Sequence, residues 1–318
     1  MRAQLLAGEP ASDPVAVAER LLAIQGQDPR GARLAVRARS TGLGGADVDS
    51  ALDAGALLIT WLNRGTLHLV RAEDYWWLQA LTTPQLRTGS DRRLAQEGVT
   101  PALLEKGIAE VVGAIAEAGP RTREELRARL VAAGVPVAGQ ALIHVLFRCA
   151  LDGLVVRGPM RGKQHCYVLV REWLGKPPRV DRATALRELG RRYLTGHGPA
   201  GDRDLAKWAG ITLADARRAL TEARPSRAAV PEGPLPLKLL GAFEPVLLGW
   251  ADRTVVLPAE RTSEVVSGGM FRPFVLHRGR AAGTWRLERG RVVVDGWGRL
   301  PAPALAAEVA DVERFLRD

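Results

Sequence analysis

Residues 57–70 read LLITWLNRGTLHLV, two β-rich runs on either side of Asn63-Arg64-Gly65. Such runs around a turn that contains glycine predict a β-hairpin. Upstream, apolar residues recur at helical spacing, and Asp28-Pro29 is a typical helix start, with Asp28 as N-cap and Pro29 in the first helical position. Helices are expected near 14–26, 30–40 and 47–54. Three short helices followed by a hairpin are typical of a winged-helix domain.

The same succession of helices and strands returns along the chain. Helices expected at 101–118, 123–133 and 140–152 precede strands at 154–156 and 165–170. A third set begins near residue 182, and two of its helices lie on either side of Gly210, the residue type expected in a helix-turn-helix. Residues 73–93 are expected to form a helix that bridges the first two units.

From about residue 234 the chain changes to short runs punctuated by Gly, Pro and Asp, which are typical of a small antiparallel barrel. The predicted fold is therefore α+β and mostly helical, with three tandem winged-helix domains followed by a small antiparallel β-barrel. A helix is expected over 304–316. The domains are expected at 1–97 (with the bridging helix), 98–178, 179–233 and 234–318, and the barrel strands at 237–248, 254–257, 274–276, 284–287 and 292–294.

The charge balance favours a polyanionic partner. The chain has 45 Lys and Arg against 35 Asp and Glu, a net charge of +10, and its sequence pI is about 10.5. Nucleic acid is the commonest such partner, so we expect double-stranded DNA. The alternative is compositional, because nearly all the cations are arginines in a chain rich in Ala and Gly.

The two cysteines, Cys149 and Cys166, imply no disulfide framework and fit a reducing compartment. We expect a cytoplasmic protein at the nucleoid, without a signal peptide, since no apolar run reaches the ~18 residues of a membrane span. No His or Cys cluster has metal-ligand spacing, so neither a metal nor a cofactor is expected. A monomer is expected, because the chain lacks coiled-coil heptads.

Several stretches, taken in order, resemble the AlkZ-like winged-helix DNA glycosylases of bacteria. The resemblance implies winged helices and a barrel around a DNA duplex, and excision of N7-alkylated guanine, including bulky and crosslinked adducts of natural-product genotoxins. The family divides into a Gln-x-Gln and a Gln-x-Asp branch, and Gln25-Gly26-Gln27 places this chain in the first, although Gly26 replaces a bulkier apolar residue. The matching stretches are 25–30, 32–35, 64–69, 198–200, 204–208, 243–250, 272–273 and 283–286.

Gln25 and Gln27 are the predicted catalytic residues. An N7-alkylated guanine is already cationic and leaves as a neutral base, so no acid is needed for the leaving group. An amide carbonyl can then accept a hydrogen bond from water and stabilise the sugar cation. Residues i and i+2 of a helix point to different faces, so this requires a helix break at Gly26. The alternative is that both glutamines are interhelical residues bonded to a turn.

Three groups of residues are expected to contact DNA. Arg30, Arg33 and Arg37 follow at i, i+3 and i+7, so they share a helix face that could meet phosphates, or a merely solvated one. Asn63 and Arg64 lie at the first wing, and His68 follows with a structural role as its alternative. The Gly-rich hairpin with Met270, Phe271 and Arg272 resembles a minor-groove wedge, or is a plain turn with two core residues.

Two functions are consistent with these residues. The first is a monofunctional glycosylase; the nearest lysine to the motif is Lys106, which argues against a Schiff-base lyase. The second is a non-catalytic winged-helix transcription regulator or architectural DNA-binding protein, for which wings and basic charge suffice. Three non-identical units and a barrel without an effector-pocket signature favour the enzyme.

Overall fold

The structure is a computed structural model that describes residues 1–162, 164–223 and 235–317. By its internal contacts the chain divides into two compact units, and each is described by itself. Unit 1 comprises Met1–Ser50 and Leu186–Asp318, and unit 2 comprises Ala51–Ala185. The division into four domains stays a prediction, and part of the third, residues 224–233, lies outside the described residues.

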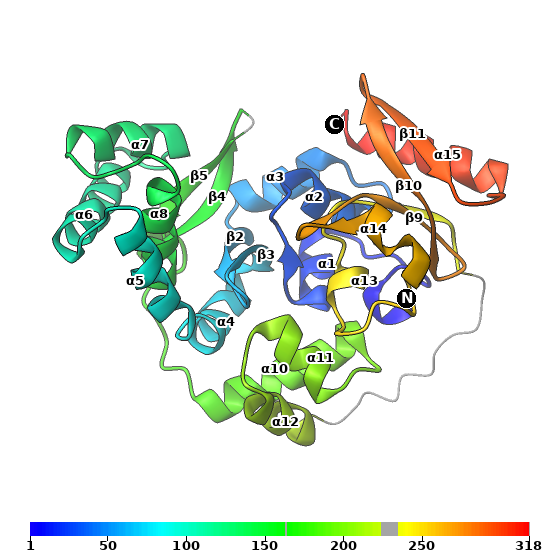
Figure 1. Cartoon of the computed structure of the whole chain (residues 1–318), viewed down its shortest axis with the longest axis horizontal. Helices are drawn as coiled ribbons and strands as arrows, with labels where there is room; N and C mark the ends of the chain where they lie inside the picture. The colour runs from blue at the N-terminus through cyan, green and yellow to red at the C-terminus, as the bar shows by residue number, and fades with distance from the viewer. Residues whose placement is uncertain (163, 224–234, 318) are drawn as a thin grey trace. The chain divides into compact units, whose positions relative to one another are not determined.

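Unit 2 is built from two β-hairpins joined in one antiparallel sheet (Figure 1). The first hairpin, β2–β3, pairs Leu57 with Arg71 through to Leu62 with Thr66. This confirms the hairpin predicted from the two β-rich runs. It meets the second hairpin, β4–β5, through Ile59 and Arg157, in the order β3-β2-β4-β5. The strands are β2 (Leu57–Leu62), β3 (Thr66–Arg71), β4 (Val155–Arg161) and β5 (Gln164–Leu169).

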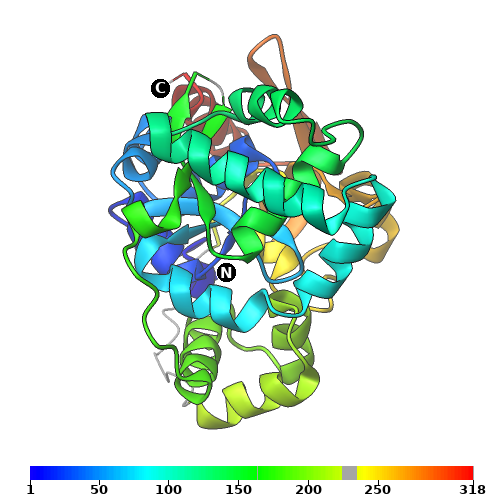
Figure 2. The same ribbon diagram turned by 90° about the vertical axis from the view of Figure 1, so that its left-hand side faces the viewer.

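Two helices of unit 2 begin at threonine caps, Thr100 and Thr122. Thr122 caps its helix in a capping box with Glu125, so that each satisfies an otherwise unpaired N–H group of the first turn. The predicted bridging helix is wrong in one respect: it is two helices, because Pro84 cannot continue a helix. In Figure 2 the helices α6 and α7 lie toward the viewer. The helices are α4 (Tyr75–Thr82), α5 (Leu86–Gln96), α6 (Pro101–Ala118), α7 (Arg123–Ala132), α8 (Ala141–Leu151) and α9 (Val170–Trp173).

Unit 1 combines helices from both ends of its sequence with an open antiparallel sheet. None of the helices in residues 1–162, 164–223 and 235–317 has both the length and the apolar character that a bilayer crossing needs. Two helices, α3 (Gly45–Asp53) and α10 (Arg182–His197), contain the boundaries between the units. The others are α1 (Pro14–Leu21), α2 (Pro29–Arg37), α11 (Asp202–Ala209), α12 (Leu213–Glu222), α13 (Pro245–Leu248), α14 (Thr262–Val265) and α15 (Ala302–Phe315).

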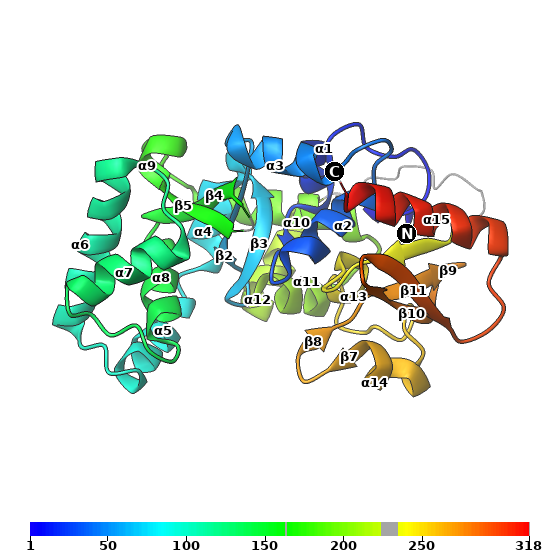
Figure 3. The ribbon, with the colours of Figure 1, turned by 90° about the horizontal axis from the view of Figure 1, so that it is seen from above.

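The predicted β-barrel is wrong. The four strands form an open sheet in the order β11-β10-β9-β6, and α15 lies along one face of it (Figure 3). Carboxylates of α15 satisfy edge-strand N–H groups: Glu308 accepts from Leu239 at 2.9 Å and Glu313 from Val292 at 3.0 Å. A covered edge needs no closure. The strands are β6 (Lys238–Leu240), β9 (Phe274–His277), β10 (Arg280–Glu288) and β11 (Arg291–Gly296).

Among the described residues, one of the five expected barrel strands is absent and another is shortened. Residues 254–257 form a turn, and the run expected over 237–248 gives only the three-residue β6 before it bends into α13. Glu244 caps α13 and Pro245 opens it, so the second half of this apolar run is helical. The remaining three strands are confirmed at 274–276, 284–287 and 292–294.

Candidate active site

The segment of the two glutamines joins two helices and is not itself helical. α1 ends at Leu21, and Leu22 leaves it with a positive φ of 66°. The chain is then extended at β1 (Ile24–Gln25), and α2 begins only at Pro29. The predicted helix break is therefore confirmed, although the helix ends five residues before Gly26. Gln25 is buried and Gln27 is exposed.

Asp28 and Pro29 fix the start of α2 directly after Gln27. The Asp28 Oδ1 atom accepts a hydrogen bond from the Gly31 N–H at 2.8 Å, and Pro29 occupies the first turn. Both roles were predicted from the sequence. The cap holds the backbone next to Gln27 in one conformation, which limits the positions that its amide can reach.

A close backbone approach brings a distant segment to the start of α2. A Cβ atom at Gly31 would collide with the Ala242 carbonyl oxygen, and one at Gly241 would lie 3.0 Å from the Leu34 Cβ. Only glycine fits at such a crossing. Phe243, the next residue, has a positive φ of 54° and is nevertheless buried. Its ring thus reaches the segment that carries Gln27.

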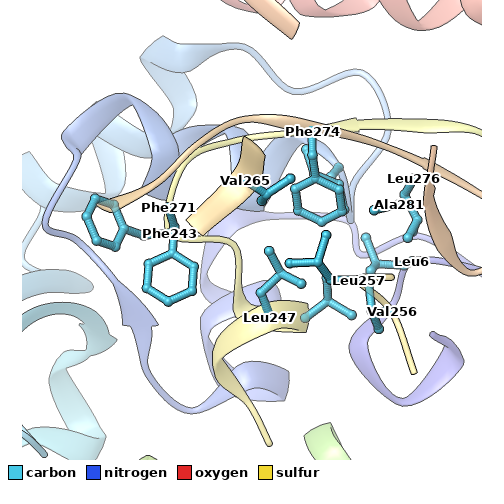
Figure 4. Close-up of a cluster of buried hydrophobic side chains, with 13 residues drawn as sticks. Leu6, Phe243, Leu247, Val256, Leu257, Val265, Phe271, Phe274, Leu276 and Ala281 are labelled. Atoms are coloured by element: carbon cyan, nitrogen blue, oxygen red, sulfur yellow. The ribbon is translucent and has the colours of Figure 1, made fainter. Parts of the chain in front are cut away.

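A two-residue hairpin forms another part of the site. β7 (Val266–Ser267) pairs with β8 (Met270–Phe271) around Gly268 and Gly269, whose φ angles of 56° and 81° are those of a type I′ turn. Phe271 points inward to Phe243, with ring centroids 5.7 Å apart, as Figure 4 shows. Met270 instead stays 58% exposed. Of the two residues predicted to form a minor-groove wedge, Phe271 is therefore a core residue, and only Met270 is exposed at the surface.

A pocket of about 500 Å³, open to solvent, lies where these parts meet in unit 1. One side of its lining is polar, with an amide, a carboxylate and a guanidinium, and the other is apolar. Gln27, Arg30 and Met270 were predicted as site residues, whereas Gln25, the other predicted catalytic residue, is buried and is not among the lining residues. The sequence interpretation gave Asp28 only a capping role and missed Phe243. The lining residues are Gln27, Asp28, Pro29, Arg30, Phe243 and Met270.

The three arginines of α2 do not share an exposed face. Arg30 is exposed at the pocket, and Arg33 is half-buried and bonded to Asp49 and to the Pro29 carbonyl. The prediction is wrong for Arg37, which is 2% exposed. Its guanidinium is held in the interior by Asp311 at 2.8 Å and Glu308 at 2.9 Å, so it is not accessible to a phosphate.

Of the other residues predicted to contact DNA, two arginines are exposed and two polar residues are buried. In unit 1, Arg272 is exposed beside the hairpin. In unit 2, Arg64 is exposed at the wing turn, but Asn63 is fully buried and its N–H donates to Thr82 Oγ1 at 3.1 Å. His68 is also buried, and its Nδ1–H donates to the Thr66 carbonyl at 2.9 Å.

Burial lowers the pKa of His68 to about 3, because desolvation and nearby Arg64 disfavour the imidazolium form. A neutral, buried and hydrogen-bonded ring matches the structural role that was the alternative for this residue.

Within residues 1–162, 164–223 and 235–317, no three His, Cys, Asp or Glu side chains gather in a way that could hold a metal ion.

The buried histidines predict an acid-sensitive fold. His197 in unit 1 also has a pKa lowered to about 3, mainly by burial. Both rings are neutral when folded, whereas the unfolded chain binds protons below about pH 6.5, so stability present above pH 6.5 is lost as the pH falls toward 3. At pH 5 we expect each histidine to reduce the unfolding free energy of its unit by about 2 kcal/mol.

Urea unfolding at pH 7 and pH 5 measures this loss. The variant His68→Gln should show a weaker pH dependence in the transition of unit 2 and an unchanged one in unit 1. An equal pH dependence in the wild type and the variant would contradict the assignment to His68.

The whole chain is similar to DNA glycosylases of one family. A family model described as DNA glycosylase AlkZ-like matches residues 18–317. An interstrand DNA cross-link repair glycosylase of Streptomyces sahachiroi is 31% identical over 348 aligned residues, which cover 96% of this chain and 92% of that protein. The solved structure of the Streptomyces sahachiroi DNA glycosylase AlkZ superposes with a TM-score of 0.77 at 27% identity, over 99% of this chain and 94% of the other.

Proposed function

This chain belongs to the AlkZ-like family of DNA glycosylases, and on that premise we propose that it hydrolyses the N-glycosidic bond of N7-alkylguanine in double-stranded DNA. Bulky and crosslinked adducts are included, since the relative from Streptomyces sahachiroi is named for cross-link repair. The observation that carries the proposal is the pocket of about 500 Å³, in which Gln27 and Arg30 lie together beside an apolar wall.

The chemistry suits neutral amides. In hydrolysis, water bonds to C1′ as the bond from C1′ to N9 breaks, and the electron pair of that bond neutralises the cationic base. The transition state resembles an oxocarbenium ion, and the leaving group needs no proton. In our proposal the amide carbonyls of Gln25 and Gln27 accept hydrogen bonds from the water and orient it, and their dipoles stabilise the sugar cation.

The exposed cations and Met270 would hold the duplex. Arg30 would bind a phosphate next to the scissile bond and Arg272 a phosphate farther along the backbone, and Arg64 of unit 2 would also bind DNA. Met270, exposed beside the Gly268-Gly269 turn, would enter the minor groove. The pocket is open to solvent, which suits a lesion too bulky for a closed base-flipping pocket. We propose a monomer that acts in the cytoplasm at the nucleoid.

The alternative of a non-catalytic regulator is set aside, because the family match extends over residues 18–317 and the family is enzymatic.

Excision of a defined lesion tests the proposal. The protein is incubated with a duplex that carries a single N7-methylguanine, and mild base with heat then converts abasic sites to strand breaks. We expect breaks at the lesion well above the spontaneous depurination of the same duplex. A second duplex with an N7-linked interstrand crosslink should separate into single strands. A break yield equal to depurination on both duplexes would reject the proposed function.

A further inference from the structure

The pocket contains an acidic group that the two-glutamine mechanism does not use. Asp28 lines it directly beside Gln27 and is half-buried. Its Oδ1 atom accepts the capping bond from Gly31. Among residues 1–162, 164–223 and 235–317, no ion pair involves this carboxylate, and it is the one acidic side chain in the pocket lining.

We propose that Asp28 is the proton acceptor and the anionic stabiliser of the reaction, beyond its role as a helix cap. This inference rests on the proposed function. As the oxygen of water bonds to C1′ and N9 departs with the electron pair of the glycosidic bond, the water proton passes to the Asp28 carboxylate. The products are neutral N7-alkylguanine, an abasic sugar and a protonated Asp28, which returns its proton to solvent.

The charge distribution around the pocket explains why a carboxylate is needed. The N-terminus of α2 carries a partial positive charge of about half an elementary charge from its aligned peptide dipoles. Arg30 adds a full positive charge at the same pocket. Both attract phosphate, but both also oppose the positive charge that develops on the sugar. The Asp28 carboxylate counters them at the same place, so the pocket can bind an anionic backbone and still stabilise a cationic transition state.

The chain contains its own control for the capping role. Asp13-Pro14 opens α1 as Asp28-Pro29 opens α2, and Asp13 Oδ1 accepts a hydrogen bond from the Ala16 N–H at the same distance, 2.8 Å. Asp13 is also half-buried, and it is not part of the pocket lining. Asparagine caps helices about as well as aspartate does, so Asp→Asn at either position removes charge and leaves the cap.

The test compares Asp28→Asn with Asp13→Asn in single-turnover excision of N7-methylguanine, together with thermal unfolding and duplex binding. We expect Asp28→Asn to lower the excision rate roughly 100-fold, a typical contribution of a general base, with binding and melting temperature close to wild type. Asp13→Asn should excise at the wild-type rate. Asp28→Glu, which keeps the charge, should recover part of the lost rate.

Two outcomes would overturn the inference: an Asp28→Asn rate within about threefold of wild type, or rate losses that match those of Asp13→Asn and track the melting temperature. If Asp28→Asn does not fold, Asp28→Ser provides the same comparison, since serine is an equally good cap. A wild-type protein that excises nothing would reject the proposed function itself, which separates that failure from a failure of the role of Asp28.

Discussion

Gln27→Ala is expected to lower the rate of N7-alkylguanine excision roughly 100- to 1,000-fold, the usual cost of removing one preorganised dipole from a charged transition state. Gln27 lies at the pocket, between the extended β1 and the capped start of α2. The backbone that carries its side chain is therefore fixed by the Asp28 cap, and in the proposed mechanism alanine leaves the water without that acceptor. The measurement is the single-turnover rate on a duplex with one N7-methylguanine.

The control for this prediction is Gln140→Ala, which truncates an exposed glutamine of unit 2. It should excise like the wild type. Gln25→Ala should also reduce excision, with DNA binding kept, and the double variant should lose less than the product of the two single losses if both amides act on one water. Wild-type excision by Gln27→Ala, with binding intact, would refute the catalytic role of this residue.

The second large effect is expected on the unfolding free energy, when the buried ion pair of Arg39 is broken. The side chains of Arg39 and Glu244 form an ion pair in which both are 0% exposed. Arg39 also donates to the Ala35 carbonyl at 2.9 Å and to Gln4 Oε1 at 3.1 Å. Arg39→Met leaves a buried carboxylate without its cation, and we expect this to reduce the unfolding free energy by about 3–5 kcal/mol.

A double-mutant cycle in urea separates the pair from its parts. Because Arg39→Met/Glu244→Gln contains no unpaired charge, it should be more stable than the Arg39→Met single variant. The exposed pair Arg286–Glu288 provides the contrast, with side chains 51% and 55% exposed, and Glu288→Gln should change the unfolding free energy by less than about 1 kcal/mol. Single and double losses that simply add would show that the two side chains do not interact.

Local signals predicted the parts of the fold that depend on neighbouring residues. The Asp28-Pro29 cap, α6 at Pro101–Ala118 and the β2–β3 hairpin all follow from residues within one helical turn or one β-turn. The closed barrel was wrong because sheet closure depends on what covers the edges, and α15 supplies that cover from far along the chain.

In the site, too, the features set by neighbouring residues were predicted and those set by distant residues were not. Gln27 could be found from a short motif, but Phe243 reaches the pocket only through the crossing of Gly31 with Ala242, about 210 residues apart. Helical spacing placed Arg37 on the face of Arg30. It could not show that Glu308 and Asp311 of α15 cover that part of the face. The signals that could have helped are the glycines at 31 and 241, which are typical of close backbone contacts.

The crossing of Gly31 with Gly241 and Ala242 has a consequence for the timing of activity during synthesis. A nascent chain displays both glutamines soon after translation begins, yet the pocket wall at Phe243 and the carboxylates that hold Arg37 are made only near the end. The pocket is therefore complete only once residues up to Met270 have been made, and a chain that ends before Phe243 is expected to be inactive.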